Sequence, residues 1–221
     1  MIIEDFDGKT FVAFLDISGF KELMKEGKAA DAMDRFYQAG YEYHATHHEV
    51  EGIFISDCGI LFVRTGYSIE QKLNTILRVI KYINRSMIDY DFMLTTSIAF
   101  GQFVYRKKIE IRGISKNAIY GNAYVDAFMN NENGLPKLQP GQCRLVKEYL
   151  PKELNLNHQL FDEFKFLKPK GNDKKHLYYY WNLNNFEDIS EFEKEYNDSY
   201  KWKFQGMLTA LKKTYNNSIT N

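Results

Sequence analysis

This 221-residue chain lacks a disulfide framework, a zinc-type cysteine motif, a proline-rich linker and net charge. Its two cysteines, Cys58 and Cys143, are too few and too far apart for a structural metal motif, and such usage is typical of a reducing compartment. Only four prolines punctuate the chain, and no repeat or low-complexity segment divides it. The length suits one sizeable core, or one domain with an appended tail.

A formal net charge of zero argues against long-range attraction to nucleic acid or to an anionic membrane. No stretch approaches the roughly 20 apolar residues that span a bilayer, and the acidic N-terminal sequence has no signal-peptide apolar region. We therefore expect a cytoplasmic protein with no nucleic-acid and no membrane partner. The aromatic fraction of 16% is high and indicates a folded globular chain.

Hydrophobic periodicity predicts alternating strands and helices. The expected strands are 10–17, two within 52–65, 92–105, 108–114, 142–150 and 176–183, and the expected helical segments are 20–48, 68–87, 121–131 and 189–215. Tight hairpins mixed with helical crossovers indicate an α+β fold, with a mostly antiparallel sheet covered by helices. We assign 1–185 to this domain and 186–221 to a C-terminal helical extension, which could cover the sheet or extend a dimer.

Two aspartates stand at the ends of predicted strands, beside small residues. Asp16 ends the apolar run in Phe-Leu-Asp-Ile-Ser-Gly-Phe (14–20), and Asp57 lies at the tip of the hairpin in 52–65. A carboxylate is costly to desolvate unless a positive charge meets it, and Mg²⁺ is commonly held by one or two carboxylates. The alternative is structural: Asp16 caps the following helix, and Asp57 occupies a turn, where aspartate is common.

The segments around these aspartates resemble the class III nucleotidyl cyclases, the adenylate and guanylate cyclase family. The resemblance is carried, in order, by FLDISGF (14–20), GIFISDCGILFV (52–63), TTSIAFGQFVY (95–105), IYGNAYVDAFMNNE (119–132) and FLKPKGNDKKHLYYYW (166–181). It implies a ferredoxin-like, palm-type sheet and a head-to-tail homodimer. It also implies that Asp16, Asp57 and the Ile17 carbonyl bind two Mg²⁺ or Mn²⁺ ions, and that Lys168 binds the triphosphate. Lys168 could instead be a solvated surface lysine.

The chain departs from the family pattern at two places. The fourth helix has Val125 and Met129 where the family has an asparagine and an arginine that orient the ribose and stabilise the transition state. Arg106 and Arg112, in the preceding hairpin, are candidate substitutes for the transition-state cation, although each alone is more typical of a solvated hairpin face. Loss of such a cation costs phosphoryl-transfer enzymes hundreds-fold or more in rate.

The second departure concerns the positions that read the base, Ile53 and Ala118, which form an apolar pair unable to recognise a purine by hydrogen bonds. Phe54 and Tyr120 flank them and could stack on a base, although buried aromatics more often belong to a core. The helix pattern Gly-x-Ala-x-Val-x-Ala (121–127) resembles the pyrimidine cyclases of Pycsar antiphage signalling. That resemblance implies synthesis of cyclic UMP or cyclic CMP from UTP or CTP, for a separate effector.

Two rival hypotheses remain open at the level of sequence. One is a catalytically inactive cyclase-homology protein that binds a nucleotide or a partner; Val125 and Met129 favour it, and retention of both aspartates opposes it. The other is a relative of diguanylate cyclases or polymerase palms, which the absence of a Gly-Gly-Asp/Glu-Glu-Phe run disfavours.

Overall fold

A computed structural model describes residues 3–66, 68–111 and 114–216. Within these ranges, it describes only the backbone at 108–111, 114–117 and 215–216. The described residues form one sheet with strand order β2-β3-β1-β4-β6-β8-β7, and β5 pairs with β4 outside this path. The strands are β1 (Phe6–Ile17), β2 (Val50–Ile55), β3 (Cys58–Val63), β4 (Leu94–Ile111), β5 (Ile114–Tyr120), β6 (Cys143–Val146), β7 (Leu167–Lys168) and β8 (His176–Tyr179). The pair β4–β6 is parallel and the other pairs are antiparallel, which confirms the predicted α+β class.

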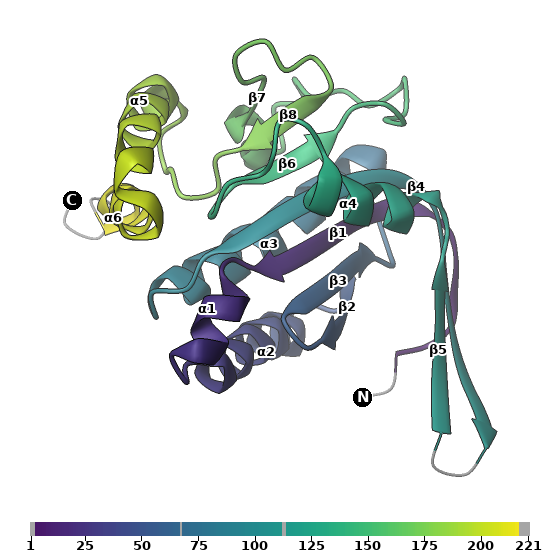
Figure 1. The fold of residues 1–221 in the computed structure, drawn as a ribbon. Coiled ribbons are helices and arrows are strands. Elements are labelled where there is room, and N and C mark those ends of the chain that lie inside the picture. The colour runs from purple at the N-terminus through teal and green to yellow at the C-terminus, as the bar shows by residue number, and fades with distance from the viewer. Residues whose placement is uncertain (1–2, 67, 112–113, 217–221) are drawn as a thin grey trace.

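Helices cover both faces of this sheet (Figure 1). They are α1 (Phe20–Lys25), α2 (Ala29–Thr46), α3 (Ile69–Ile88), α4 (Asn122–Asn133), α5 (Ile189–Ser199) and α6 (Lys203–Asn216). Since successive strand residues point to opposite faces, the central strand β1 is buried on both sides. Phe11, Ala13 and Leu15 face the core beneath α2 and α3, whereas Val12 and Phe14 join a second apolar cluster beneath α4.

The longest crossover helix, α3, forms as its sequence predicts. Ser68 is its N-cap, and the Ser68 side chain accepts a hydrogen bond of 3.1 Å from the Gln71 amide. One stripe of the helix, including Leu73, Ile76 and Ile80, is fully buried against the sheet. This packing fixes one wall of the core beneath β1 and β3.

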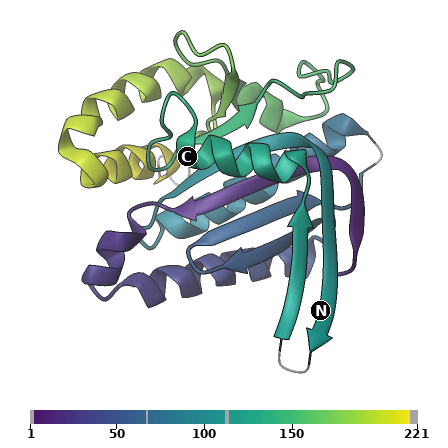
Figure 2. The same cartoon turned by 45° about the vertical axis from the view of Figure 1, so that its right-hand side comes forward.

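Residues 94–111 form one continuous strand, so the predicted break between the strands at 92–105 and 108–114 is wrong. β4 runs to Ile111, and its return partner β5 was not predicted as a strand. Together they form a two-stranded arm that projects from the body (Figures 1 and 2). An arm outside the core needs no apolar face, so the charged residues at 106–108 look like a turn in sequence.

The C-terminal helices pack onto the same core as the rest of the chain. Phe192 and Tyr196 of α5 and Leu208 and Leu211 of α6 belong to the main apolar cluster. The Tyr196 hydroxyl donates a hydrogen bond to the Pro140 carbonyl, which fastens α5 beside β6. The domain boundary at 185/186 stays a prediction.

No helix in the described ranges has the length and apolar character required for a transmembrane span.

Candidate metal and nucleotide site

Asp16 and Asp57 lie side by side at one end of the sheet. Asp16 is the penultimate residue of β1 and pairs with Cys58, the first residue of β3. Asp57 immediately precedes Cys58 in the two-residue turn between β2 and β3, and its carbonyl accepts a hydrogen bond of 3.0 Å from the Ile17 amide. Neighbouring antiparallel strands therefore bring together two carboxylates that are 41 positions apart in sequence.

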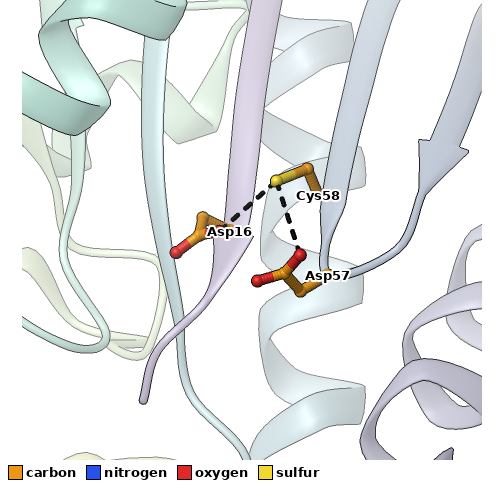
Figure 3. A group of neighbouring side chains, drawn as sticks. All are labelled: Asp16, Asp57 and Cys58. Carbon is orange, nitrogen blue, oxygen red and sulfur yellow. Dashed lines mark hydrogen bonds between the residues drawn. The ribbon is translucent and has the colours of Figure 1, made fainter. Parts of the chain in front are cut away.

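The Cys58 side chain completes this group (Figure 3). Its thiol donates a hydrogen bond of 3.4 Å to Asp16 Oδ1 and lies 4.0 Å from Asp57 Oδ1. One potential ligand atom from each of Asp16, Asp57 and Cys58 falls within 4.8 Å of the others, and all three residues are half-buried. The set suits a divalent cation, and its two carboxylates are the hard oxygen ligands that Mg²⁺ and Mn²⁺ prefer.

The electrostatics of the group favour a bound cation. The pKa of Asp16 is raised to about 6, chiefly by burial; the Cys58 hydrogen bond lowers this pKa, and the nearby carboxylates of Asp57 and Glu132 raise it. Burial, with Asp16 and Asp57 nearby, also raises the pKa of the Cys58 thiol to about 12. A carboxylate held among other acidic groups is unfavourable alone and is stabilised by a positive charge placed between them.

Helix α4 lies over the strands next to this group and is tied to them at its C-terminal end. Asn131 donates a hydrogen bond of 3.3 Å to the Phe14 carbonyl and accepts one of 3.1 Å from Thr95, the residue paired with Asp16. The helix presents Ala123, Ala127 and Asn131 to the sheet. Sequence reasoning overlooked the neighbouring Glu132, whose carboxylate raises the pKa of Asp16.

Val125 and Met129 stand where the family resemblance implies transition-state residues, and they lie on the face of α4 that points away from the sheet. Val125 and Met129 are 49% and 47% exposed, since they are offset by half a turn from the buried stripe. They therefore point away from the Asp16–Asp57 group of their own chain.

The four predicted base-pocket residues do not form one group within the chain. Ile53 is buried in the apolar cluster beneath α4. Phe54, the next residue along β2, points to the other face and packs edge-on against Phe36 of α2, with ring centroids 4.9 Å apart. Phe54 therefore lies outside the candidate site, because strand alternation places its ring in the helix layer. Ala118 and the exposed Tyr120 lie on β5, in the arm.

The predicted cations also lie away from the Asp16–Asp57 group of the same chain. Lys168 is on β7, at the edge of the sheet opposite to β2, with its ammonium 6.0 Å from the ring of Phe186. Arg106 forms ion pairs with Asp7 at 3.0 Å and with Asp5 at 3.6 Å. Arg106 lies eleven positions along β4 from Thr95, the strand partner of Asp16, or about 36 Å of strand. Arg112 falls outside the described residues.

Comparison with known proteins supports the fold. No protein-family model matches the chain. No curated protein sequence matches it either. Among solved structures, the adenylyl cyclase CyaB from P. aeruginosa is similar with a TM-score of 0.52 and 13% identity, over 80% of this chain and 94% of that chain.

Two further structures are similar at the same level. The guanylate cyclase domain of RhGC from Catenaria anguillulae, in complex with GTP, has a TM-score of 0.50 and 11% identity, over 80% of this chain and 96% of that one. A class III adenylyl cyclase-like ATP-binding protein from Pseudomonas aeruginosa has a TM-score of 0.52 and 11% identity, over 65% of this chain and 34% of that one. The chain therefore has the fold of class III cyclase catalytic domains.

Proposed function

We propose that this protein is a metal-dependent nucleotidyl cyclase, which converts a nucleoside triphosphate to its 3′,5′-cyclic monophosphate and pyrophosphate. The observation that carries the proposal is the convergence of Asp16 and Asp57 at the ends of β1 and the β2–β3 turn, on the fold of class III cyclases. Two carboxylates that converge from a strand end and a neighbouring turn, one of them with a raised pKa, are difficult to explain as helix cap and turn residue alone.

In this proposal Asp16, Asp57 and the main-chain carbonyl of Ile17 hold two Mg²⁺ or Mn²⁺ ions. When bound, such ions lower the pKa of the ribose 3′-hydroxyl and neutralise negative charge on the triphosphate. The chain's own task is positioning: the carboxylates fix the place of the α-phosphate relative to the 3′-oxygen. The 3′-hydroxyl gives up its proton to water, its oxygen attacks the α-phosphorus in line, the bond to the bridging oxygen breaks, and pyrophosphate leaves.

We further propose that the substrate is a pyrimidine triphosphate, UTP or CTP. The side chains of Ile53 and Ala118 have no hydrogen-bonding groups, and a site that reads a purine needs polar groups there. Tyr120 is exposed at the end of β5 and is available for stacking on a base. The resemblance to Pycsar cyclases adds an antiphage role, with the cyclic nucleotide acting on a separate effector.

The working unit in this proposal is a head-to-tail homodimer with two sites. Within one chain, Val125 points away from the aspartates and Lys168 lies at the far edge of the sheet. A two-fold arrangement would let α4 and Lys168 of one subunit face Asp16 and Asp57 of the other. Each site would then receive its carboxylates and its triphosphate cation from different subunits.

A second candidate function is nucleotide binding without turnover. Apolar Val125 and Met129 replace the usual polar pair, and Arg106 is already engaged by Asp5 and Asp7. One structural neighbour is described as an adenylyl cyclase-like ATP-binding protein. In this alternative, Asp16 and Asp57 hold a metal–nucleotide complex whose binding changes the dimer.

Incubation of the purified protein with each of the four NTPs and Mn²⁺, followed by mass spectrometry of the products, tests these proposals. We expect cyclic UMP or cyclic CMP, lost in Asp16→Asn and Asp57→Asn but kept in Asp162→Asn, an exposed carboxylate in a surface ion pair. Product from ATP alone would refute the pyrimidine assignment. Binding of a nucleotide without any product would refute the cyclase proposal in favour of the second function.

A further inference from the structure

The turn that carries Asp57 has an unfavourable backbone conformation. Ile55 and Cys58 close the β2–β3 hairpin as a pair, so Ser56 and Asp57 are its two turn residues. Ser56 has a φ of 56°, in the left-handed region that residues with a Cβ rarely occupy. Such a conformation persists only where surrounding contacts enforce it.

Two hydrogen bonds hold the peptide groups on either side of Asp57. The carbonyl of Ser56, which belongs to the peptide bond entering Asp57, accepts a hydrogen bond of 2.8 Å from the hydroxyl of Tyr37. The carbonyl of Asp57, in the peptide bond leaving it, accepts the 3.0 Å hydrogen bond from the Ile17 amide. Because both flanking peptide planes are fixed, the direction of the Asp57 side chain from its Cα is fixed as well.

Tyr37 is itself held in place by α2 and by β2. Its ring packs edge-on against Phe54, with centroids 5.7 Å apart, and Phe54 packs against Phe36 on the same helix. Gly59 follows Cys58 in β3, and a Cβ there would approach Phe36 to 2.8 Å and Phe54 to 3.2 Å. The aromatic contacts thus reach the back of the turn, and they anchor the phenol ring independently of its hydroxyl.

We propose that Tyr37 is a positioning residue for the metal site: its hydroxyl holds the Ser56–Asp57 peptide so that the Asp57 carboxylate faces Asp16. This inference rests on the proposed function, since it assigns a role within the same site. It deepens that function by extending the site to α2, on the far side of the sheet from α4. The Tyr37 hydroxyl touches neither metal nor nucleotide and acts only through Asp57.

The test is Tyr37→Phe, which removes one oxygen and keeps the ring. The matched control is Tyr41→Phe, one helical turn further along α2, where the ring is 73% exposed and the structure gives its hydroxyl no partner among the described residues. Mn²⁺ binding to the nucleotide-free protein is measured by electron paramagnetic resonance, from the loss of the free-ion signal. We expect Mn²⁺ affinity to fall about three- to tenfold in Tyr37→Phe and to stay unchanged in Tyr41→Phe.

Activity assays add a second readout that a purely structural role would not move. With the substrate nucleotide, Tyr37→Phe should raise the Mn²⁺ concentration for half-maximal activity by the same factor. The nucleotide KM at saturating Mn²⁺ and the melting temperature should stay unchanged. If wild type binds Mn²⁺ through Asp16 and Asp57 but makes no product, the cyclase proposal fails and the binding comparison still decides the role of Tyr37. Equal Mn²⁺ affinity in wild type and Tyr37→Phe would overturn the inference.

Discussion

Replacing Asp16 by asparagine should stabilise the metal-free protein at neutral pH while it removes the proposed activity. Burial raises the pKa of Asp16 from its ordinary value of 3.8 to about 6, with Asp57 and Glu132 adding to the effect and the Cys58 hydrogen bond opposing it. At pH 7.5 the ionised form is therefore less favourable in the folded chain than in the unfolded chain. The amide keeps the shape of the side chain and removes this charge.

The expected gain follows from the change in pKa on folding. The difference between 3.8 and about 6 corresponds to about 3 kcal/mol at about 1.36 kcal/mol per pKa unit. Asp16 is only half-buried, and screening by water reduces this to about 1.5 kcal/mol. In a chain of this length, that raises the melting temperature by roughly 3–6 °C.

The pH dependence has a defined sign. Between pH 3.8 and about 6 the folded state binds the Asp16 proton more strongly than the unfolded state does. The stability of the wild type therefore falls as pH rises through this window, and the loss is complete above it. The advantage of Asp16→Asn should be full at pH 7.5 and should shrink steadily as pH is lowered toward 4.

Urea denaturation in EDTA, followed by circular dichroism at several values between pH 4.5 and 7.5, measures this advantage. Asp162→Asn, an exposed carboxylate paired with Lys165, serves as the control and should change stability little. Added Mn²⁺ should stabilise the wild type and leave Asp16→Asn unaffected. A variant that is less stable than the wild type at pH 7.5, or an advantage that does not change with pH, would refute the electrostatic reasoning.

Three further substitutions test the scaffold. Arg144→Met should lower the free energy of unfolding in urea by about 3–5 kcal/mol. The fully buried guanidinium of Arg144 donates hydrogen bonds to the Asn130 side chain and to the carbonyls of Asn130 and Pro136. An unchanged free energy of unfolding would contradict a stabilising role for this network. Phe36→Ala should cost about 3–5 kcal/mol by calorimetry, because it opens a cavity in a fully buried site. Ser68→Ala should cost about 1 kcal/mol by urea titration, with Ser68→Gly costing less; equal losses would exclude the cap as the cause.

The placement of the aspartates was predictable because local signals agreed. The apolar run before Asp16 is typical of a strand buried on both faces, and Ser-Asp-Cys-Gly (56–59) is typical of a hairpin turn, of which Ser56 and Asp57 form the turn and Cys58 and Gly59 begin β3. What sequence could not supply was the register. The pairing of Asp16 with Cys58, which brings the thiol between the carboxylates, depends on how β1 and β3 align across 42 positions.

Other features depend on contacts that periodicity does not report. The face of β2 on which Phe54 lies follows from its register with β3, so the sequence favoured core packing for this ring but left base stacking open. In the β4–β5 arm, apolar alternation predicted a strand only at 108–114, because the residues at 106–108 are charged. At Gly101, a Cβ would meet the Asn122 side chain at 2.5 Å, where that side chain accepts a hydrogen bond from the Gln102 amide.

The charges acting on Asp16 from its own chain, Asp57 and Glu132, are acidic, so the proposed site needs cations from elsewhere. If the second subunit supplies Lys168, two inactive variants should complement each other. In a heterodimer of Asp57→Asn and Lys168→Ala, a site shared between subunits would carry both substitutions in one copy and neither substitution in the other. A site built within a single chain would instead carry one substitution in every copy. Unfolding and refolding the variants together at equal concentrations should therefore restore about a quarter of wild-type activity, because half of the dimers are mixed and each has one intact site. The activity of each variant refolded alone is the control. Absence of recovery from the mixture, with dimers present by light scattering, would place Lys168 in the site of its own chain or outside the site altogether.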